Sequence, residues 1–228
     1  MSANSPLAVL LDFDGTLTNV DVGHMIMDEF AVPDWESIES GWPGNGASFR
    51  GLLEREYALL PSNRERDIER FARHRAEVRM GAVELVRFCV DNGIAVEIVS
   101  GGLSNYIDPL LEHFGIPRVP ISSLTADFNQ GERAVTTYPE GVVRCDESGA
   151  CKCARVWHNK EAGRKVVFAG DGASDFCVAK EADVLFARGT LADHCRTTGI
   201  PFTPFDSLLP VLDAVRELDQ VRRSPSGP

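Results

Sequence analysis

Two carboxylates follow a short apolar run near the start of the chain. Residues 7–11 are too few for a helix and are typical of a strand buried on both faces, and Asp12 and Asp14 follow them. Side chains two apart on an extended strand point the same way, so these carboxylates repel each other unless a cation lies between them, and their hard oxygens favour Mg²⁺. Gly15 and Thr16 then allow a sharp turn that exposes amides to a phosphate. The same pattern also occurs in turns that do no chemistry.

A second acidic loop follows another apolar run. Residues 165–169 are predicted to form a buried strand that opens into Gly170-Asp171-Gly172-Ala173-Ser174-Asp175. The carboxylates of Asp171 and Asp175 can bind one cation, the first directly and the second through water. Ser174 or Asp175 can instead cap the following helix, but capping does not account for Asp171.

A phosphate site also needs hydrogen-bond donors and a fixed positive charge. The segment Val99-Ser100-Gly101-Gly102 offers a hydroxyl and small-residue amides where a strand runs into a helix, although Ser-Gly turns are common. The chain has four lysines. Lys165 precedes its strand and Lys180 follows the acidic loop by a helix, which leaves Lys152 and Lys160 as candidates.

The elements that must position these residues alternate between strands and helices. Strand patterns cover 7–11, 94–99, 119–124, 165–169 and 184–187, and helical patterns cover 81–92, 103–114, 152–159, 176–181, 191–198 and 206–221. This alternation predicts an α/β protein with a doubly wound parallel sheet, in which ligands bind at the carboxyl ends of the strands. The candidate residues all lie at those ends.

One long interval breaks the alternation. Residues 19–79 show helical patterns at 22–30, 48–60 and 64–76 and no strand pattern. We therefore expect a small α-helical cap over 19–79, inserted into a core formed by residues 1–18 and 80–221. We also expect a β-hairpin insertion outside the main sheet at 127–150 and a disordered tail at 222–228.

Charge and hydropathy bound the partners. A net charge of −11 at pH 7 argues against nucleic acid or an anionic membrane, because either would be repelled over most of the surface. No apolar run approaches twenty residues, and residues 1–6 lack a signal-peptide pattern. We expect a cytoplasmic monomer or homodimer.

The six cysteines are expected to be reduced in that compartment. Cys89, Cys177 and Cys195 lie in apolar contexts and are interpreted as small core residues. Three others are spaced by six and then two residues without a fourth ligand nearby, so we favour reduced thiols over zinc or a disulfide. These three are Cys145, Cys151 and Cys153.

The acidic motifs resemble those of a known superfamily. Asp12-Phe13-Asp14-Gly15-Thr16 is similar to the first motif of the haloacid dehalogenase (HAD) superfamily, and residues 99–102 and 170–175 match its second and fourth motifs in order and spacing. The resemblance implies a Rossmann-like core, a C1-type cap and Mg²⁺-dependent hydrolysis of a small phosphomonoester through an aspartyl-phosphate. It also favours Lys152 over Lys160 as the third-motif lysine.

The resemblance further implies roles for individual residues. Asp12 attacks phosphorus, while Asp14 protonates the leaving alcohol and then activates water. Dehalogenases of this superfamily lack an aspartate at that step, so we do not expect a dehalogenase. The implied phosphate-binding residues are Ser100, Gly101 and Lys152, and the implied Mg²⁺ ligands are Asp12, the Asp14 carbonyl, Asp171 and, through water, Asp175.

Further segments point to a substrate class. Residues 60–63, 99–102, 149–153, 182–188 and 202–205 look like those of the 2-hydroxy-3-keto-5-methylthiopentenyl-1-phosphate phosphatases of methionine salvage. Residues 170–177 are also similar to the fourth motif of phosphocholine and phosphoethanolamine phosphatases, which stay an alternative. A mutase-type phosphoryl transfer and a noncatalytic binding protein on the same fold are alternatives from other classes. The presence together of Asp12, Asp14, Lys152, Asp171 and Asp175 argues against the noncatalytic protein.

Phosphoserine phosphatases are a weaker alternative. They use a cap acid and an arginine to hold the amino-acid head; Asp21 falls at the position of that acid, but Glu54 falls about where the arginine is expected. Arg50 or Arg55 could compensate. Other cap residues could line the pocket or simply form the core of the cap, namely His24, Phe30, Trp35, Trp42 and Phe49.

Overall fold

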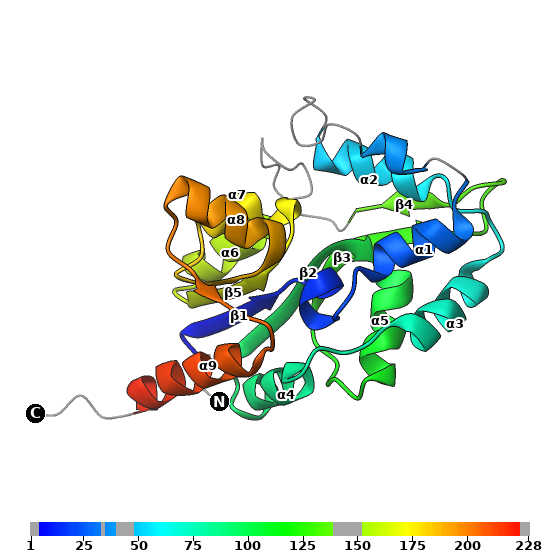
Figure 1. The fold of residues 1–228 in the computed structure, drawn as a ribbon. Coiled ribbons are helices and arrows are strands. Elements are labelled where there is room, and N and C mark those ends of the chain that lie inside the picture. The colour runs from blue at the N-terminus through cyan, green and yellow to red at the C-terminus, as the bar shows by residue number, and fades with distance from the viewer. Residues whose placement is uncertain (1–4, 33–34, 40–47, 139–151, 224–228) are drawn as a thin grey trace, which may run out of the picture.

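The sheet at the centre of the molecule has helices on both faces (Figure 1). The computed structural model describes residues 5–32, 35–39, 48–138 and 152–223. Within them, seven strands lie in the order β4-β3-β2-β1-β5-β6-β7, all parallel to their neighbours except β4. The predicted α/β class is confirmed. The strands are β1 (Leu7–Leu11), β2 (Ala95–Leu103), β3 (Ile121–Asp127), β4 (Val135–Thr137), β5 (Lys165–Gly170), β6 (Val184–Ala187) and β7 (Thr203–Pro204).

The helices largely follow the sequence periodicity. They are α1 (Val22–Phe30), α2 (Phe49–Tyr57), α3 (Glu65–Arg75), α4 (Ala82–Asp91), α5 (Ser104–His113), α6 (Lys152–Glu161), α7 (Phe176–Ala179), α8 (Gly189–Thr198) and α9 (Leu209–Arg223), with short helical turns at Trp35–Ile38 and Ala173–Asp175. None of the helices in the described part of the chain is long and apolar enough to cross a membrane.

Strand β1 is buried on both faces, as its unbroken apolar sequence requires. Leu7, Val9 and Leu11 pack into the core that also contains residues of α4, α5 and α9. Ala8 and Leu10 point to the opposite face, into the core shared with α6, α7 and α8. The alternation of one strand between two hydrophobic cores therefore fixes the three-layer arrangement.

The order of the strands creates the crevice for a site. Strand β1 pairs with β2 on one side and β5 on the other, both in parallel. The chain passes from β1 to β2, β3 and β4 on one side and then returns to form β5, β6 and β7 on the other side of β1. Such a switch point opens a crevice at the carboxyl ends of the strands. The residues that follow β1 and β5, and those at the end of β2, therefore meet at one edge of the sheet.

The described residues between β1 and α4 form α1, α2, α3 and two short helical turns, Phe13–Leu17 and Trp35–Ile38, and they contribute no strand to the sheet. Their apolar side chains, such as Val22, Ile26 and Leu53, join the same hydrophobic cluster as the face of β1 that carries Leu11. Figure 1 shows α1 and α2 to one side of the sheet. The exact cap boundaries at residues 19 and 79 stay a prediction.

Three boundaries differ from expectation. Strand β2 continues through Ser100 to Leu103 because its register shifts after Val99 and lets pairing with β3 resume. Strand β4 joins the edge of the main sheet, since β3 extends to Asp127 and offers it a free edge. Helix α9 continues to Arg223, whose Nε lies 2.6 Å from Asp219 Oδ2. Residues 139–150 of the expected hairpin and 224–228 of the expected tail lie outside the described residues.

Arg79 holds the turn after β1 in place. Its side chain is 5% exposed, and its guanidinium donates to backbone carbonyls at 2.7–2.9 Å. Gly15, Thr16 and Thr18 are buried, so the arginine gives the carbonyls of this turn a charged donor where water has little access. It thereby links the turn to the segment before α9. The four acceptors are the carbonyl oxygens of Gly15, Thr16, Thr18 and Asp206.

We predict that Arg79→Ala lowers the free energy of unfolding by about 3 kcal/mol, because it leaves buried carbonyls without their charged donor. Urea denaturation followed by circular dichroism measures this loss. The matched control is Arg70→Ala on α3, which removes a 70% exposed side chain paired with Asp67 and should cost less than about 0.5 kcal/mol. A loss no greater in Arg79→Ala than in Arg70→Ala would contradict the assignment.

Candidate active site

Lys152 joins two buried carboxylates at the carboxyl edge of the sheet. Its Nζ lies 2.7 Å from Asp12 Oδ1 and 2.7 Å from Asp175 Oδ1. The three residues are only 3%, 5% and 0% exposed, respectively. Burial alone would lower the pKa of the Lys152 ammonium, but the charges of Asp12 and Asp175 outweigh it and raise that pKa above its ordinary value. Lys152 is therefore a fixed positive charge.

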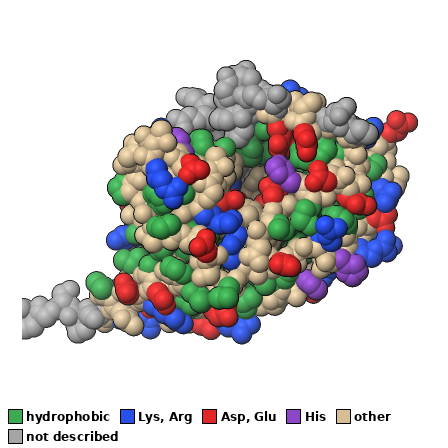
Figure 2. Space-filling view, viewed as in Figure 1, with side chains coloured by type: hydrophobic (Ala, Val, Ile, Leu, Met, Phe, Trp, Pro, Cys, Tyr) green, Lys and Arg blue, Asp and Glu red, His purple; other side chains and the backbone are tan. Residues whose placement is uncertain are grey.

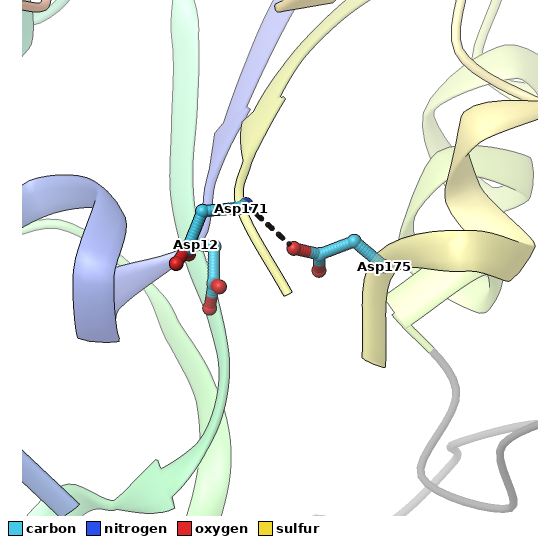
Figure 3. Close-up of side chains that lie close together, drawn as sticks. All are labelled: Asp12, Asp171 and Asp175. Atoms are coloured by element: carbon cyan, nitrogen blue, oxygen red, sulfur yellow. Dashed lines mark hydrogen bonds between the residues drawn. The ribbon is translucent and has the colours of Figure 1, made fainter. Parts of the chain in front are cut away.

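Asp171 completes the acidic cluster (Figure 3). One carboxylate oxygen from each of Asp12, Asp171 and Asp175 lies within 4.8 Å of the others. Asp175 Oδ2 accepts the backbone amides of Asp171 at 3.0 Å and Gly172 at 3.2 Å, which fixes the loop after β5. The Thr16 hydroxyl donates to Asp171 Oδ1 at 2.9 Å. The loops after β1 and β5 are thus tied to each other.

The charge of this cluster fits a divalent cation. Three carboxylates surround one ammonium, which leaves an excess of two negative charges when all are ionised. Burial, with Asp175 next in importance, raises the pKa of Asp171 to about 6, and burial also raises the pKa of Asp12. A divalent ion would relieve this repulsion, and an all-oxygen donor set suits Mg²⁺. Asp12 and Asp171 line the adjoining cavity and would be its ligands.

Asp175 has a different position from the other two acids. It is fully buried, does not line the cavity, and is engaged by Lys152 and two amides. Asp175 therefore holds the Lys152 ammonium and the loop after β5 in position. Contact with a cation through water stays a prediction for Asp175, as does a part for the Asp14 carbonyl.

Asp14 faces the same cavity and connects the sheet to α1. Its Oδ2 accepts a hydrogen bond of 2.7 Å from the Tyr106 hydroxyl, and its Oδ1 accepts the amides of Val22 at 3.0 Å and Gly23 at 3.3 Å. Burial, followed by the charge of Asp21, raises the pKa of Asp14 to about 7. The carboxyl group can therefore give and take a proton near neutral pH.

The turn after Asp14 needs glycine. Gly15 has a φ of +69°, and a Cβ there would lie 2.2 Å from Asp171 Oδ2. The expected sharp turn is confirmed, but exposure of its first amide is not, because Gly15 N donates to Val20 O at 3.1 Å. This amide is used within the turn because the chain folds back toward α1, a contact that the local sequence does not reveal.

Ser100 and Gly101 line the cavity, as expected for phosphate-binding residues. The Ser100 hydroxyl oxygen accepts the amide of Gly102 at 2.9 Å, which leaves its proton free to point elsewhere. A Cβ on Gly102 would lie 2.0 Å from the Tyr106 hydroxyl oxygen, so the bond between Tyr106 and Asp14 requires glycine at this position. A role in binding phosphate stays a prediction for both lining residues.

The competing lysine lies elsewhere. Lys160 Nζ is 3.3 Å from Asp183 Oδ1 and does not line the cavity, whereas Lys152 does. The preference for Lys152 therefore agrees with the geometry.

A cavity of about 490 Å³ contains these groups, and Figure 2 shows a hollow with acidic and histidine side chains beside it. Of the cap residues considered, His24 and Phe49 line the cavity. Phe30 packs edge-on against Phe71, and the Trp35 indole donates to Asp28 Oδ1 at 3.1 Å, so both are structural. Trp42 lies outside the described residues.

Several site residues escaped the sequence analysis. Tyr106 is 92 residues from Asp14, and nothing in its local sequence marks it. Glu39, Glu56 and Tyr57 line the cavity from the cap but belong to ordinary helical or irregular stretches. Thr16 was noted only for its turn, although its place directly after the acidic motif could have suggested a contact with the second acidic loop.

The cysteines divide into two groups. Cys89, Cys177 and Cys195 are buried and free of disulfides, which confirms them as core thiols. Cys153 is disulfide-bonded, so the expectation of a reduced thiol is wrong for this residue. A disulfide depends on which Cβ atoms the fold brings within about 4 Å, and sequence spacing does not reveal that. Cys145 and Cys151 lie outside the described residues.

Known proteins share this sequence pattern and fold. A family model described as haloacid dehalogenase-like hydrolase matches residues 9–180. Two curated relatives are each 33% identical to this chain, and both are named 2-hydroxy-3-keto-5-methylthiopentenyl-1-phosphate phosphatase. The alignment with the Brevibacillus brevis protein covers 95% of this chain and 97% of that protein. The alignment with the Exiguobacterium sibiricum protein covers 91% of this chain and 95% of that protein.

Solved structures agree on the fold. A phosphoserine phosphatase described as a phospho-aspartyl intermediate analogue has a TM-score of 0.69 at 21% identity, with coverage of 91% of this chain and 98% of that one. The match to the family model spans the segments that carry Asp12, Ser100, Lys152 and Asp171. The chain therefore belongs to the haloacid dehalogenase-like hydrolases.

Proposed function

We propose that this hydrolase is a Mg²⁺-dependent phosphatase that releases phosphate from a small phosphomonoester through an aspartyl-phosphate on Asp12. The observation that carries the proposal is the pairing of Asp12 with Lys152 in a cluster whose excess negative charge suits a divalent cation. Asp14, with its pKa near neutrality, faces the same cavity. Nucleophile, fixed cation and proton carrier are thus in one place.

The contacts of Asp12 suggest which oxygen reacts. Its Oδ1 accepts the Phe13 amide at 2.8 Å and lies 2.7 Å from Lys152 Nζ. Its Oδ2 is therefore the oxygen left to attack phosphorus. The attack forms the bond between Asp12 and phosphorus as the ester bond breaks, and Asp14 gives its proton to the leaving alcohol oxygen.

The second half of the reaction reuses the same residues. Asp14, now a carboxylate, takes a proton from water as that water attacks the phosphorus, which releases phosphate and restores the Asp12 carboxylate. Lys152, Ser100 and Gly101 would bind the oxygens of the transferring group. When bound by Asp12 and Asp171, Mg²⁺ supplies further neutralisation of the charge on those oxygens.

The relatives and the cavity together favour one leaving group. Both relatives described above are named for a substrate with hydroxyl, keto and methylthio groups. The cavity offers apolar contacts from Met27, Leu52 and Leu53 beside polar groups of the cap, which suits a chain of mixed polarity. We therefore propose 2-hydroxy-3-keto-5-methylthiopentenyl-1-phosphate as the substrate, with phosphocholine or phosphoethanolamine as the alternative.

Phosphoserine is a poorer fit to the cap. No arginine is among the described residues that line the cavity, and its lysine and histidine are already paired with carboxylates, which leaves none of these described side chains to match the α-carboxylate of phosphoserine. Arg50 bonds to Glu54 at 3.0 Å and stacks on Tyr138, and Arg55 donates to the Gly51 carbonyl. Neither compensates for the missing contact.

We predict that Asp12→Asn abolishes phosphate release, with a loss of at least about 10³-fold in kcat, because an amide is a poor nucleophile. A phosphate-release assay on p-nitrophenyl phosphate measures the loss, and circular dichroism confirms folding. Asp193→Asn, which changes a 78% exposed carboxylate on α8, is the matched control and should retain activity. Substantial turnover by folded Asp12→Asn would rule out the covalent mechanism.

Removal of metal should stop the reaction and lower thermal stability together. Chelation with EDTA is expected to abolish turnover, and added Mg²⁺ should restore turnover and raise Tm, since an ion that binds only the folded state stabilises it. The rise in Tm should disappear in Asp171→Asn. If turnover survives chelation and Mg²⁺ leaves Tm unchanged, the metal assignment is wrong.

A panel of phosphomonoesters tests the substrate. We expect the highest kcat/KM for 2-hydroxy-3-keto-5-methylthiopentenyl-1-phosphate among that ester, phosphocholine, phosphoethanolamine, phosphoserine and pyridoxal phosphate. The reason is the mixed apolar and polar lining of the cap and its lack of a described arginine. A clear preference for phosphocholine or phosphoethanolamine would establish the alternative, and preference for phosphoserine would contradict both.

A further inference from the structure

The cavity has a second end, away from the acidic cluster. This cap end is lined by side chains of α1 and α2 together with Glu39, and it is where the leaving group of a phosphomonoester would lie once its phosphate met Asp12. It combines apolar and acidic side chains. The residues used below are Asp21, His24, Glu39 and Glu56.

The cap end carries more negative than positive charge. It holds three carboxyl groups and one histidine, and the described lining has no arginine. Lys152, the lysine in that lining, is already paired with Asp12 and Asp175. A leaving group with a carboxylate or a second phosphate would therefore lie near carboxyl groups, and the histidine there, His24, is already paired with Glu39.

Two of the three carboxyl groups already have partners. Glu39 Oε1 lies 2.9 Å from His24 Nε2, and the first cause that raises the pKa of His24 to about 9 is this hydrogen bond. Asp21 caps α1, where its Oδ1 accepts the amide of His24 at 2.8 Å. These contacts place both acids without help from a ligand.

Glu56 is different. It lines the cavity from α2 and is 5% exposed, and its Oε1 is buried with no hydrogen-bond partner among the described residues. Burial, and then the charge of Glu39, raise the pKa of this carboxyl group to about 7. A buried acceptor without a donor is costly, so it is an acceptor that a ligand can satisfy.

We propose that Glu56 is a specificity-determining residue that selects phosphomonoesters whose leaving group carries a hydrogen-bond donor, a hydroxyl or an ammonium, and no second anionic group. The inference rests on the proposed phosphatase function and adds the chemical class of the leaving group. Glu56 Oε1 accepts the donor, and the surplus of acid at the cap end excludes anions.

Four esters of similar size test the inference: glycerol 1-phosphate, phosphoethanolamine, propyl phosphate and phosphoglycolate. They offer hydroxyl donors, an ammonium, no donor and a carboxylate, respectively. Wild-type enzyme should hydrolyse the first two with kcat/KM about 10-fold or more above the last two, as expected for one hydrogen bond to a charged group. Preference for phosphoglycolate or propyl phosphate would overturn the proposal even if no variant folds.

Glu56→Gln tests the residue itself, because it keeps the shape of the side chain and removes its charge. We expect it to reduce the preference for a donor-bearing ester over phosphoglycolate by about 10-fold. If the kcat/KM ratio to phosphoglycolate falls only for phosphoethanolamine, Glu56 accepts from an ammonium. If the ratio also falls for glycerol 1-phosphate, Glu56 accepts from a hydroxyl as well. Glu54→Gln, on the same helix but 45% exposed and outside the cavity lining, should leave the ratios within about twofold.

The two levels of the proposal fail separately. If wild-type enzyme hydrolyses p-nitrophenyl phosphate and folded Glu56→Gln has unchanged ratios, the role of Glu56 is wrong and the phosphatase proposal stands. If wild-type enzyme releases no phosphate from p-nitrophenyl phosphate or any of the four esters, the phosphatase proposal falls and takes this inference with it.

Discussion

The concentration of negative charge around Lys152 is the constraint on which the rest of the site depends. Strands β1 and β5 are neighbours, so the acids that follow them are forced together at one edge of the sheet. One ammonium cannot balance the three clustered carboxylates, of which those of Asp12 and Asp175 are buried, and two amides on Asp175 only partly compensate. The remaining excess of negative charge is what we propose a divalent cation neutralises.

Asp14 connects the carboxyl edge of the sheet to helix α1 of the cap. Its two carboxylate oxygens are held by Tyr106 from α5 and by the first amides of α1. Helix α1 and its N-cap residue, Asp21, also reach the cavity, which His24 of this helix lines together with Asp21. Because the Asp14 carboxylate contacts both α5 and the start of α1, it holds the acidic cluster and the cap end of the cavity in a fixed relative position.

The turn between these residues depends on cations from distant segments. Arg79 donates to three carbonyls of the turn and to the Asp206 carbonyl, and Arg188 donates to the Gly15 carbonyl at 2.8 Å.

The fold is shared with phosphoserine phosphatases, yet no arginine is among the described residues with which the cap of this chain lines the cavity. The shared fold therefore does not carry the specificity: we propose that the sheet positions the reacting groups and that the cap side chains select the leaving group.

The sequence by itself determined the strand that leads into Asp12 and the loop of Asp171, because strand periodicity is a local property. It narrowed the lysine to Lys152 or Lys160, and only the resemblance to the superfamily favoured Lys152. Only the tertiary structure decided the contacts of Tyr106, Arg79 and Glu56, the continuation of β2 through Ser100, and the disulfide of Cys153. These depend on which distant residues pack together. Side-chain contacts across dozens of residues leave no periodic trace in a single sequence, whereas a buried strand and the acids at its end do.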